Sequence, residues 1–522
     1  MTLLRIGLDV GGTNTDAAAV DESGSVVSWH KAVTTPDVFD GIREALTAVL
    51  RDIDSDAVGQ VMLGTTHPLN AVIRRRGLAR VGILRIAAPA TLSISPLASW
   101  PRDLAGIVRG QVEIIQGGHE YEGTEIMPLD EDAVRAFARR CSDRVDAIAV
   151  TGVTSPANPD HELRARLIIQ EVLGDSCPVT LGHEVGGLGL LERENSAVLN
   201  GALTFVGRDI VRGLQQALES HGLQPDLYIT QNDGTLLAAA EAARRPIMTI
   251  GSGPTNSMRG AAYLSGLSDA IVMDVGGTST DVGLLVDGFP RESSLAVEIG
   301  GVRTNYRMPD LISVGLGGGS ILRTSDEPAG GPAAGPDSVG YQLEERALIF
   351  GGDTATLSDV AVLVGRADFG DRSLAEAKLS GEVMRAALDW VDDRIQSLSE
   401  RIKATRSELP LIAVGGGAHL VPDRIPGVPQ VIRHRYSSVA NAIGAAISEA
   451  SGSVDRSMRY DDSSREQCIA EATAAATDAA IHAGADPALV RITSVNEIPM
   501  AYMPGNCARL QVKAAGPLLQ HT

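Results

Sequence analysis

The sequence predicts an α/β fold in which two related half-domains face each other across a cleft, followed by a small α+β segment. The main observation is a phrase of eight residues that occurs twice, with seven identical positions and with the second copy starting 265 residues after the first. Short apolar runs flank each copy, a pattern typical of strand, tight turn and strand. Abundant glycine (57 residues) and few aromatics (3%) suit close α/β packing. The copies are Asp9-Val10-Gly11-Gly12-Thr13-Asn14-Thr15-Asp16 and Asp274-Val275-Gly276-Gly277-Thr278-Ser279-Thr280-Asp281.

Each copy has the composition of a phosphate-binding turn. Paired glycines allow positive φ angles and let backbone N–H groups approach an anion, and the hydroxyl groups add donors. The aspartate that opens each copy, Asp9 or Asp274, can hold a hydrated divalent cation. One such turn is usually only a turn, but two facing copies would grip a polyphosphate from both sides. The predicted contacts are Gly11, Gly12, Thr13, Asn14 and Thr15 (the first turn) and Gly276, Gly277, Thr278 and Ser279 (the second turn).

Length and charge limit the classes of protein to consider. With 522 residues the chain has room for two or three domains and an ample core. The formal net charge of −20 argues against broad binding of nucleic acids or anionic membranes, because both are polyanionic. The sequence shows no signal-peptide pattern and no apolar run near the roughly 20 residues of a membrane-spanning helix. The four cysteines lack metal-binding spacing, so we expect reduced thiols in a cytoplasmic protein.

Apolar periodicity and turn residues predict the order of the elements. The first half-domain is predicted over residues 1–195 and the second over 196–450, with a last helix at about 437–450 that packs back on the first half. Residues 451–464 are polar and predict a linker, and 465–522 form the α+β appendage. We expect strands within 3–35, 61–64, 80–86, 146–151, 179–181, 228–231, 409–414, 490–495 and 508–514, and helices over 37–51 (capped by Asp37), 161–173, 190–221, 373–407 and 465–483.

Three side chains outside the two turns are candidate catalytic groups on the substrate side. His67 follows Gly64-Thr65-Thr66 at a step from strand to loop to helix, where α/β sheets place ligands. His119 lies beside Glu120 in a polar loop and could transfer protons. Glu192 opens a predicted helix, where it would equally well act as an N-terminal capping charge. The aspartates that close the two turns, Asp16 and Asp281, could instead fix the hairpins through local hydrogen bonds.

The two phrases and a distal Gly-Gly-Gly-Ala turn resemble the phosphate loops and the adenosine loop of the actin/sugar-kinase/heat-shock-70 ATPase fold, which is ribonuclease H-like. Finer matches resemble one branch, the hydantoinase A/oxoprolinase family of ATP-dependent enzymes that open cyclic amides. The resemblance covers about residues 3–450. It rests on Gly64-Thr65-Thr66, Asn70-Ala71-Val72, Arg76-Gly77, Gly118-His119-Glu120-Tyr121-Glu122-Gly123, residues 192–200, Asn232-Asp233-Gly234, Gly251-Ser252-Gly253-Pro254, Gly317-Gly318-Gly319-Ser320 and residues 440–445.

The resemblance implies that ATP and Mg²⁺ bind in a nucleotide cleft between the half-domains, with Asp9 and Asp274 around the metal. It implies phosphorylation of the carbonyl of a hydantoin, 5-oxoproline or related lactam, followed by hydrolysis. Many relatives need a second subunit of the same family, so we expect such a partner, in a homo-oligomer or hetero-oligomer. Further nucleotide contacts are predicted at Gly317 and Gly318, and Gly415, Gly416 and Gly417 are predicted to line the adenosine.

The chain departs from the family pattern in two places. Relatives usually carry Pro-Gly-Pro-Ala-Cys-Tyr-Gly where this chain reads Val339-Gly340-Tyr341-Gln342-Leu343, and the chain is shorter than the larger members. Two rival functions stay open at this point. One is a small-molecule kinase of the same fold, which would release a stable phosphate ester. The other is a nucleotide-gated binding module without small-molecule catalysis. The stretches 64–70 and 192–200 favour the amide-opening reaction.

Overall fold

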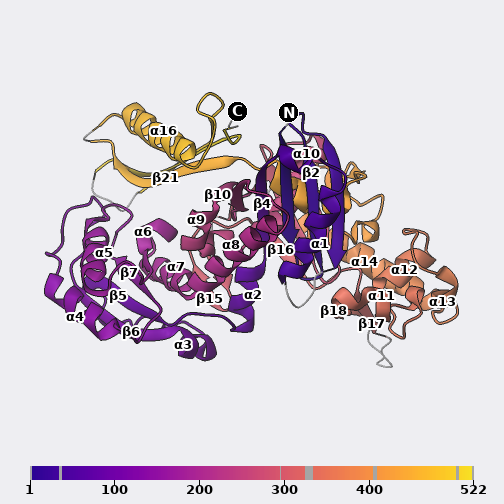
Figure 1. Ribbon diagram of the computed structural model, residues 1–522, viewed down its shortest axis with the longest axis horizontal. Coiled ribbons are helices and arrows are strands. Elements are labelled where there is room, and N and C mark those ends of the chain that lie inside the picture. The colour runs from indigo at the N-terminus through magenta and orange to yellow at the C-terminus, as the bar shows by residue number, and fades with distance from the viewer. Residues whose placement is uncertain are drawn as a thin grey trace.

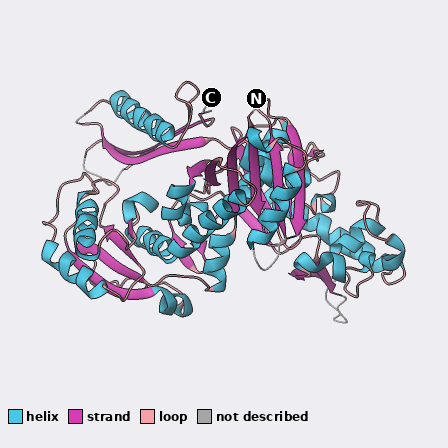
Figure 2. Ribbon diagram, viewed as in Figure 1, coloured by secondary structure: helices cyan, strands magenta, loops and turns pink. Residues whose placement is uncertain are grey.

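A computed structural model describes residues 3–33, 38–293, 296–323, 333–403, 408–461, 463–500 and 505–519. Sheets of mixed strand direction are covered by helices, which confirms the predicted α/β fold (Figure 2). Figure 1 shows an elongated molecule in which a central body carries a lobe at each end. The cap predicted at Asp37 lies outside the described residues.

The larger sheet of the central body contains the first copy of the repeated phrase. Its strand order is β22-β23-β21-β10-β9-β4-β1-β2-β3, with β1 antiparallel to β2 and parallel to β4. The predicted apolar face of helix α1, with Ile42, Leu46 and Val49, is buried in the core beneath this sheet. The elements are β1 (Leu4–Val10), β2 (Asn14–Val20), β3 (Val26–Val33), α1 (Val38–Leu50), β4 (Val58–Thr65), β9 (Asp226–Thr230) and β10 (Leu236–Ala238).

The second sheet repeats this arrangement around the second copy of the phrase. β11 is antiparallel to β12 and parallel to β19, as β1 is to β2 and β4. The boundary between the half-domains is predicted at residue 195. Strands β9 and β10 come after this residue in the chain but belong to the larger sheet. The division into half-domains therefore stays a prediction. The elements are β11 (Ala270–Val275), β12 (Thr280–Val286), β13 (Phe289–Pro290), β16 (Leu311–Val314), β19 (Leu411–Val414) and β20 (Val431–Ile432).

Two helices, α10 (Ser252–Ser265) and α15 (Ala440–Ala446), cross between the two sheets. A Cβ on Gly260 would lie 1.8 Å from the carbonyl oxygen of Ala440, and one on Gly444 would lie 1.9 Å from that of Asn256. Only glycine permits such backbone contact, so these two positions set the helix crossing. Helix α15 also packs against β1 and β2.

The lobes at the two ends extend the two halves. At one end, parallel strands in the order β6-β5-β7-β8 pack against helices (left in Figure 1), and at the other end a group of helices surrounds a hairpin. The first lobe contains β5 (Val81–Ala88), α3 (Arg102–Val108), β6 (Arg109–Gln116), α4 (Glu131–Cys141), β7 (Ala147–Gly152), α5 (Asp160–Leu173) and β8 (Val179–Leu181). The second contains β17 (Ser320–Arg323), β18 (Ala333–Ser338), α11 (Leu343–Arg346), α12 (Leu357–Leu363), α13 (Arg372–Glu376) and α14 (Gly381–Ile402).

Three predicted helices are interrupted in the structure, and the one expected over 373–407 is α13 and α14 with a break at 377–380. The helix expected over 190–221 is two helices, α7 (Leu190–Ala202) and α8 (Thr204–Glu219), that meet at Leu203. Every residue from Arg193 to Ala202 is buried, so α7 runs through the protein rather than along its surface. The segment expected as one helix over 437–450 is a short 3-10 turn followed by α15. Helix α15 ends at Ala446, and Ala450 already belongs to strand β21.

The C-terminal segment is part of the larger sheet, and the predicted linker at 451–464 is wrong for most of its length. β21 pairs with β10 in parallel and with β23 in antiparallel orientation. The residues of β21 are small and polar, a composition that is typical of a linker. Most of the pairing of β21 is with β23, some fifty residues later in the chain, and local composition does not reveal such a distant partner. The segment contains β21 (Ala450–Arg459), α16 (Arg465–His482), β22 (Arg491–Pro499) and β23 (Cys507–Gly516).

Lys513 ties this segment to both halves. Its side chain is 7% exposed, and its Nζ lies 2.7 Å from Asp233 and 3.4 Å from Glu292. Burial raises the pKa of Asp233, but the charge of Lys513 and the hydrogen bonds from Lys513 and Thr235 together outweigh this, so the pKa is lowered overall. Lys513→Met leaves buried carboxylate charge unpaired, so we expect the free energy of unfolding to fall by about 3 kcal/mol in a denaturant titration. Lys378→Met, at an exposed site, should change it by less than about 0.5 kcal/mol; equal effects would contradict the prediction.

Candidate nucleotide site

The two repeated turns have the same geometry and lie against each other. In each hairpin the two aspartates of the phrase are cross-strand partners, Asp9 with Asp16 and Asp274 with Asp281. Each turn is closed by the same backbone hydrogen bond, from the N–H of its first glycine to the carbonyl three residues on, at 2.9 Å. A Cβ on Gly277 would lie 3.5 Å from Cγ2 of Thr13. The first and second turns therefore face each other, and a methyl group added to Gly277 would just contact Thr13.

Asp9 is buried behind the first turn and receives hydrogen bonds on both carboxylate oxygens. The amide of Asn256 donates to Oδ1 and that of Asn441 to Oδ2, each at 3.0 Å. Burial raises the pKa of Asp9 to about 7, with a smaller contribution from the nearby charge of Asp16, while the two amides act in the opposite direction. The carboxylate is thus oriented by uncharged donors, which do not neutralise its charge once it is ionised.

Asp274 occupies the equivalent position behind the second turn. The hydroxyl of Ser257 donates to its Oδ2. A Cβ on Gly415 would lie 2.3 Å from its Oδ1, so this glycine, at φ +88°, leaves the space that the carboxylate needs. Burial raises the pKa of Asp274 above its ordinary value.

The aspartates that close the phrase serve the hairpins through hydrogen bonds and an ion pair. Asp16 pairs with Lys31 on β3 at 2.6 Å and accepts a hydrogen bond from Asn441 at 2.8 Å. Asp281 accepts a hydrogen bond from the hydroxyl of Ser313, its cross-strand neighbour on β16. Burial raises the pKa of Asp281 to about 6. Of the two roles considered for this pair, the contacts support the local one.

The distal glycine-rich segments pack on the second turn. The N–H of Gly318 donates to the carbonyl of Gly276 at 3.0 Å, and the N–H of Gly417 donates to that of Val275 at 2.7 Å. Gly416, between its two packed neighbours, has no atom within 4 Å of the position where a Cβ would stand. The segment at 339–343 lies nearby, since the hydroxyl of Ser338, just before it, donates to the carbonyl of Gly277 at 3.2 Å.

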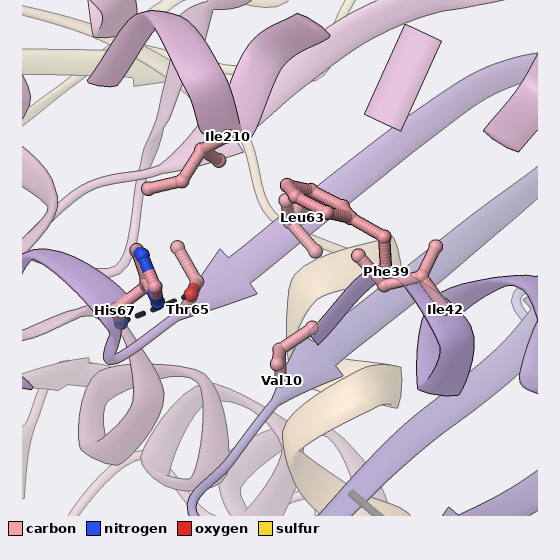
Figure 3. Close-up of a pocket in the computed structure, with 7 residues that line it drawn as sticks. All are labelled: Val10, Phe39, Ile42, Leu63, Thr65, His67 and Ile210. Atoms are coloured by element: carbon pink, nitrogen blue, oxygen red, sulfur yellow. Dashed lines mark hydrogen bonds between the residues drawn. The ribbon is translucent and has the colours of Figure 1, made fainter. Parts of the chain in front are cut away.

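On the side of the first turn, Gly64-Thr65-Thr66 leads from β4 into helix α2 (His67–Arg74). The N–H of Thr65 donates to the hydroxyl of Ser252 at 3.1 Å, which joins this segment to α10. His67 lies at a small apolar cavity beside the end of β1 (Figure 3). Burial lowers the pKa of His67, so its imidazole is neutral at pH 7. The cavity is lined by Val10, Phe39, Ile42, Leu63, Thr65, His67 and Ile210.

His119 and Glu192 are not brought together with the two turns. His119 follows β6 in the lobe of parallel strands, is 4% exposed, and packs its ring 4.3 Å from that of His161. Glu192 lies in the first turn of α7, 3.8 Å from Arg303. In the described part of the chain, no hydrogen bond or ion pair joins either side chain to a residue of the two turns. The catalytic role predicted for them stays a prediction without support from this geometry.

Sequence reasoning missed three donors, namely Asn256, Ser257 and Asn441. Two of them lie just after the recognised Gly251-Ser252-Gly253-Pro254 segment, and the third lies within the recognised 440–445 segment. The available signal was a polar residue in a helix of small apolar residues. That pattern indicates a buried polar contact, because Asn and Ser are poor choices for such a helix interior.

The carboxylate oxygens at this site fit a magnesium ion that is held jointly by protein and phosphate. Mg²⁺ in such sites usually keeps several waters and takes one or two carboxylates together with phosphate oxygens. Asp9 and Asp274 supply two carboxylates behind the facing turns. A group of three or more His, Cys, Asp or Glu side chains that could hold a metal ion does not occur in the described ranges.

The raised pKa of Asp9 predicts a pH dependence. With a pKa of about 7 the carboxylate is mostly protonated at pH 6 and mostly ionised at pH 8. Because a metal ion needs the ionised form, affinity for Mg²⁺-ADP should rise about tenfold between these pH values. Calorimetric titration measures this. Asp9→Asn should abolish the part of the dependence that Asp9 causes; an unchanged profile in this variant would contradict the assignment.

Comparison with known proteins agrees with the resemblance. Family models for the hydantoinase/oxoprolinase N-terminal region and for hydantoinase/oxoprolinase match residues 5–173 and 193–373. Acetophenone carboxylase gamma subunit of Aromatoleum aromaticum is 29% identical over 69% of this chain and 53% of its own length. Caprolactamase subunit alpha of Pseudomonas jessenii is 28% identical over 75% of this chain and 58% of its own.

The likeness extends to three dimensions. The solved ATP-dependent caprolactamase from Pseudomonas jessenii aligns with a TM-score of 0.76 at 22% identity, over 99% of this chain and 89% of that one. No helix in the described ranges is long and apolar enough to cross a membrane.

The order of the motifs, the paired turns and the family matches lead to one assignment. The chain belongs to the hydantoinase/oxoprolinase family.

Proposed function

We propose that this protein uses ATP to activate the carbonyl oxygen of a small molecule, and that the molecule is a cyclic amide such as a hydantoin, 5-oxoproline or a related lactam. The observation that carries the proposal is that the two turns face each other, with the buried Asp9 behind one and the half-buried Asp274 behind the other. Two phosphate-binding turns that face each other can hold a polyphosphate from both sides. That arrangement suits transfer of a terminal phosphoryl group better than simple storage of a nucleotide.

The chain's own groups divide the work of phosphoryl transfer. Backbone N–H and hydroxyl groups of the two turns hold the phosphates, and Asp9 and Asp274 hold Mg²⁺ directly or through water. When bound, Mg²⁺ neutralises charge on the phosphates during transfer. Catalysis of this kind is mainly positioning and charge stabilisation. His67, neutral and close to the end of β1, is the candidate substrate-side group that lies nearest to the first turn along the chain.

Phosphorylation solves the chemical problem that an amide poses. The amide carbon is a poor electrophile, and moving the γ-phosphoryl group from ATP to the carbonyl oxygen activates it. Water then adds to the carbon, and the C–N bond breaks as the nitrogen takes up a proton. A second water hydrolyses the resulting acyl phosphate to a carboxylate and phosphate, so that the balance is one ATP and one opened ring.

A ketone is the second candidate substrate, because relatives include acetophenone carboxylase as well as caprolactamase. A ketone and a lactam share the carbonyl oxygen that would accept the phosphoryl group. Both relatives are named as subunits, and the chain spans little more than half of their length. We therefore propose that a second subunit completes the reaction.

A screen of ATP hydrolysis tests the proposal. The purified chain, alone and with the product of a neighbouring gene, is assayed with hydantoin, 5-oxoproline, caprolactam, acetone and acetophenone. Stimulation by a lactam together with ring opening would support the first candidate, and stimulation by ketones alone would support the second. A stable phosphate ester as product would instead indicate a kinase. ATP hydrolysis that no carbonyl compound changes would indicate a nucleotide-gated binding module.

A further inference from the structure

Helix α10 connects the two acidic groups of the nucleotide site through two consecutive residues. Asn256 donates from Nδ2 to Asp9 Oδ1 at 3.0 Å and to Thr230 Oγ1 at 3.1 Å. Its neighbour Ser257 donates to Asp274 Oδ2. Asp9 belongs to the sheet of the first half and Asp274 to that of the second. One peptide unit of α10 thus spans the pair of carboxylates that the two halves contribute.

We propose that Asn256 and Ser257 are positioning residues that hold Asp9 and Asp274 in one fixed relative orientation for a shared Mg²⁺-nucleotide ligand. The inference rests on the proposed nucleotide-dependent function and adds to it the element that couples the two halves of the site. A shift of either sheet against α10 would break one of these hydrogen bonds. The helix therefore sets the relative position of the two carboxylates to within the tolerance of a hydrogen bond.

The packing around α10 leaves these side chains little freedom. Asn256 is fully buried, and Ser257 is 2% exposed. A Cβ on Gly64 would lie 2.0 Å from Asn256 Nδ2 and 2.4 Å from Asp9 Oδ1, so glycine at this position makes room for the hydrogen bond. On the other side of the helix, the contact of α10 with α15 at Gly444 fixes the backbone at Asn256. The side chain is held by its surroundings as well as by its own hydrogen bonds.

The chemistry of the two donors suits a metal site. An amide and a hydroxyl orient a carboxylate without cancelling its charge, whereas an arginine or lysine would compete with the cation. Asn256 Oδ1 is buried and has no hydrogen-bond partner among the described residues. An unpaired buried polar atom costs stability, typically about 1–3 kcal/mol. The Nδ2 group, in contrast, donates to both Asp9 and Thr230, so the hydrogen-bonded half of the amide faces the carboxylate.

The test compares variants of α10 in ATP hydrolysis as a function of Mg²⁺ concentration. Asn256→Ala, Asn256→Asp and Ser257→Ala are measured against Thr255→Val, a matched control. Thr255 is fully buried in the same turn of the helix, and its hydroxyl donates only to backbone carbonyls. We expect the Mg²⁺ concentration at half-maximal rate to rise at least fivefold for Asn256→Ala and Ser257→Ala. Asn256→Asp, which places a second carboxylate against Asp9, should raise it further.

The control separates positioning from folding. Thr255→Val should lower the thermal unfolding midpoint but leave the Mg²⁺ dependence as in the unchanged protein. If the variants at Asn256 and Ser257 shift the midpoint alone, as the control does, the inference is overturned. Should Asn256→Ala fail to fold, the isosteric Asn256→Asp and the conservative Ser257→Ala decide the question with the same readout.

The double variant gives an independent criterion. Two residues that hold one metal geometry should show less than additive losses, because the first removal already releases the pair of carboxylates. Strictly additive effects on the Mg²⁺ dependence would contradict the shared role. If the unchanged protein neither binds nor hydrolyses Mg²⁺-ATP, the proposed function itself has failed. If it does both and only the variants behave like the control, the positioning role alone has failed.

Discussion

Asp9→Asn and Asp274→Asn are each expected to lower the rate of Mg²⁺-dependent ATP hydrolysis by at least about a hundredfold, or about 2.7 kcal/mol in the activation barrier. Asp9 is buried and Asp274 is half-buried behind the facing turns, where a carboxylate has a large effect on a bound cation because water screens it less than at the surface. Asparagine keeps the shape and removes only the charge. Phosphate release under saturating ATP and titrated Mg²⁺ measures the effect.

A carboxylate away from the cleft provides the control for these variants. Asp392 on α14 pairs with Arg366 and belongs to the lobe at the other end of the second half. Asp392→Asn also removes one negative charge from a half-buried ion pair, but its hydrolysis rate should stay within about twofold of the unchanged protein. If Asp9→Asn and Asp274→Asn both left nucleotide binding and hydrolysis intact, the two-turn site would be wrong.

Gly415→Ala should reduce nucleotide binding and hydrolysis by about tenfold or more, although it adds a single methyl group. Gly415 has a φ of +88°, and its Cβ would lie 2.3 Å from Asp274 Oδ1 and 2.4 Å from the carbonyl oxygen of Val275. The backbone strain alone costs roughly 1 kcal/mol, and the contact forces the carboxylate out of position. Calorimetric titration of Mg²⁺-ADP and the hydrolysis rate follow the change.

Gly416→Ala is the matched control one residue further on. A Cβ at this position meets nothing within 4 Å, and the backbone needs no positive φ. We expect binding within about twofold of the unchanged protein. The prediction for this segment from sequence was three equivalent adenosine contacts, so equal losses at Gly415 and Gly416 would support that earlier interpretation. A loss at Gly415 alone would show that this glycine acts through Asp274.

The repeated hairpins were readable from sequence because their information is local. Two glycines in a row, flanked by apolar runs, specify a tight turn between strands whatever the rest of the chain does. The structure gives both hairpins the same register and the same closing hydrogen bond. Amphipathic α1 and the capped helix α16 follow from local patterns in the same way, since periodicity and a capping box need only neighbouring residues.

Elements that depend on distant partners were misread for a physical reason. β21 is built of small and polar residues and is stabilised by pairing with β23, so its own composition predicted a linker. The segment from 190 to 221 has helical periodicity throughout, and its division into α7 and α8 at Leu203 accompanies the burial of α7 inside the first half. Propensity states what a segment prefers alone, and tertiary contacts override it.

The sequence by itself determined that two glycine-rich hairpin turns of the same kind exist and that an aspartate stands at the head of each. Tertiary structure decided which groups surround these aspartates. Asn256, Ser257 and Asn441 reach them from helices that are up to 432 residues away along the chain. His119 and Glu192 lie in other surroundings, where ring packing and an ion pair engage them. Spacing in sequence encodes turns and faces, whereas the meeting of distant side chains depends on how whole sheets and helices pack.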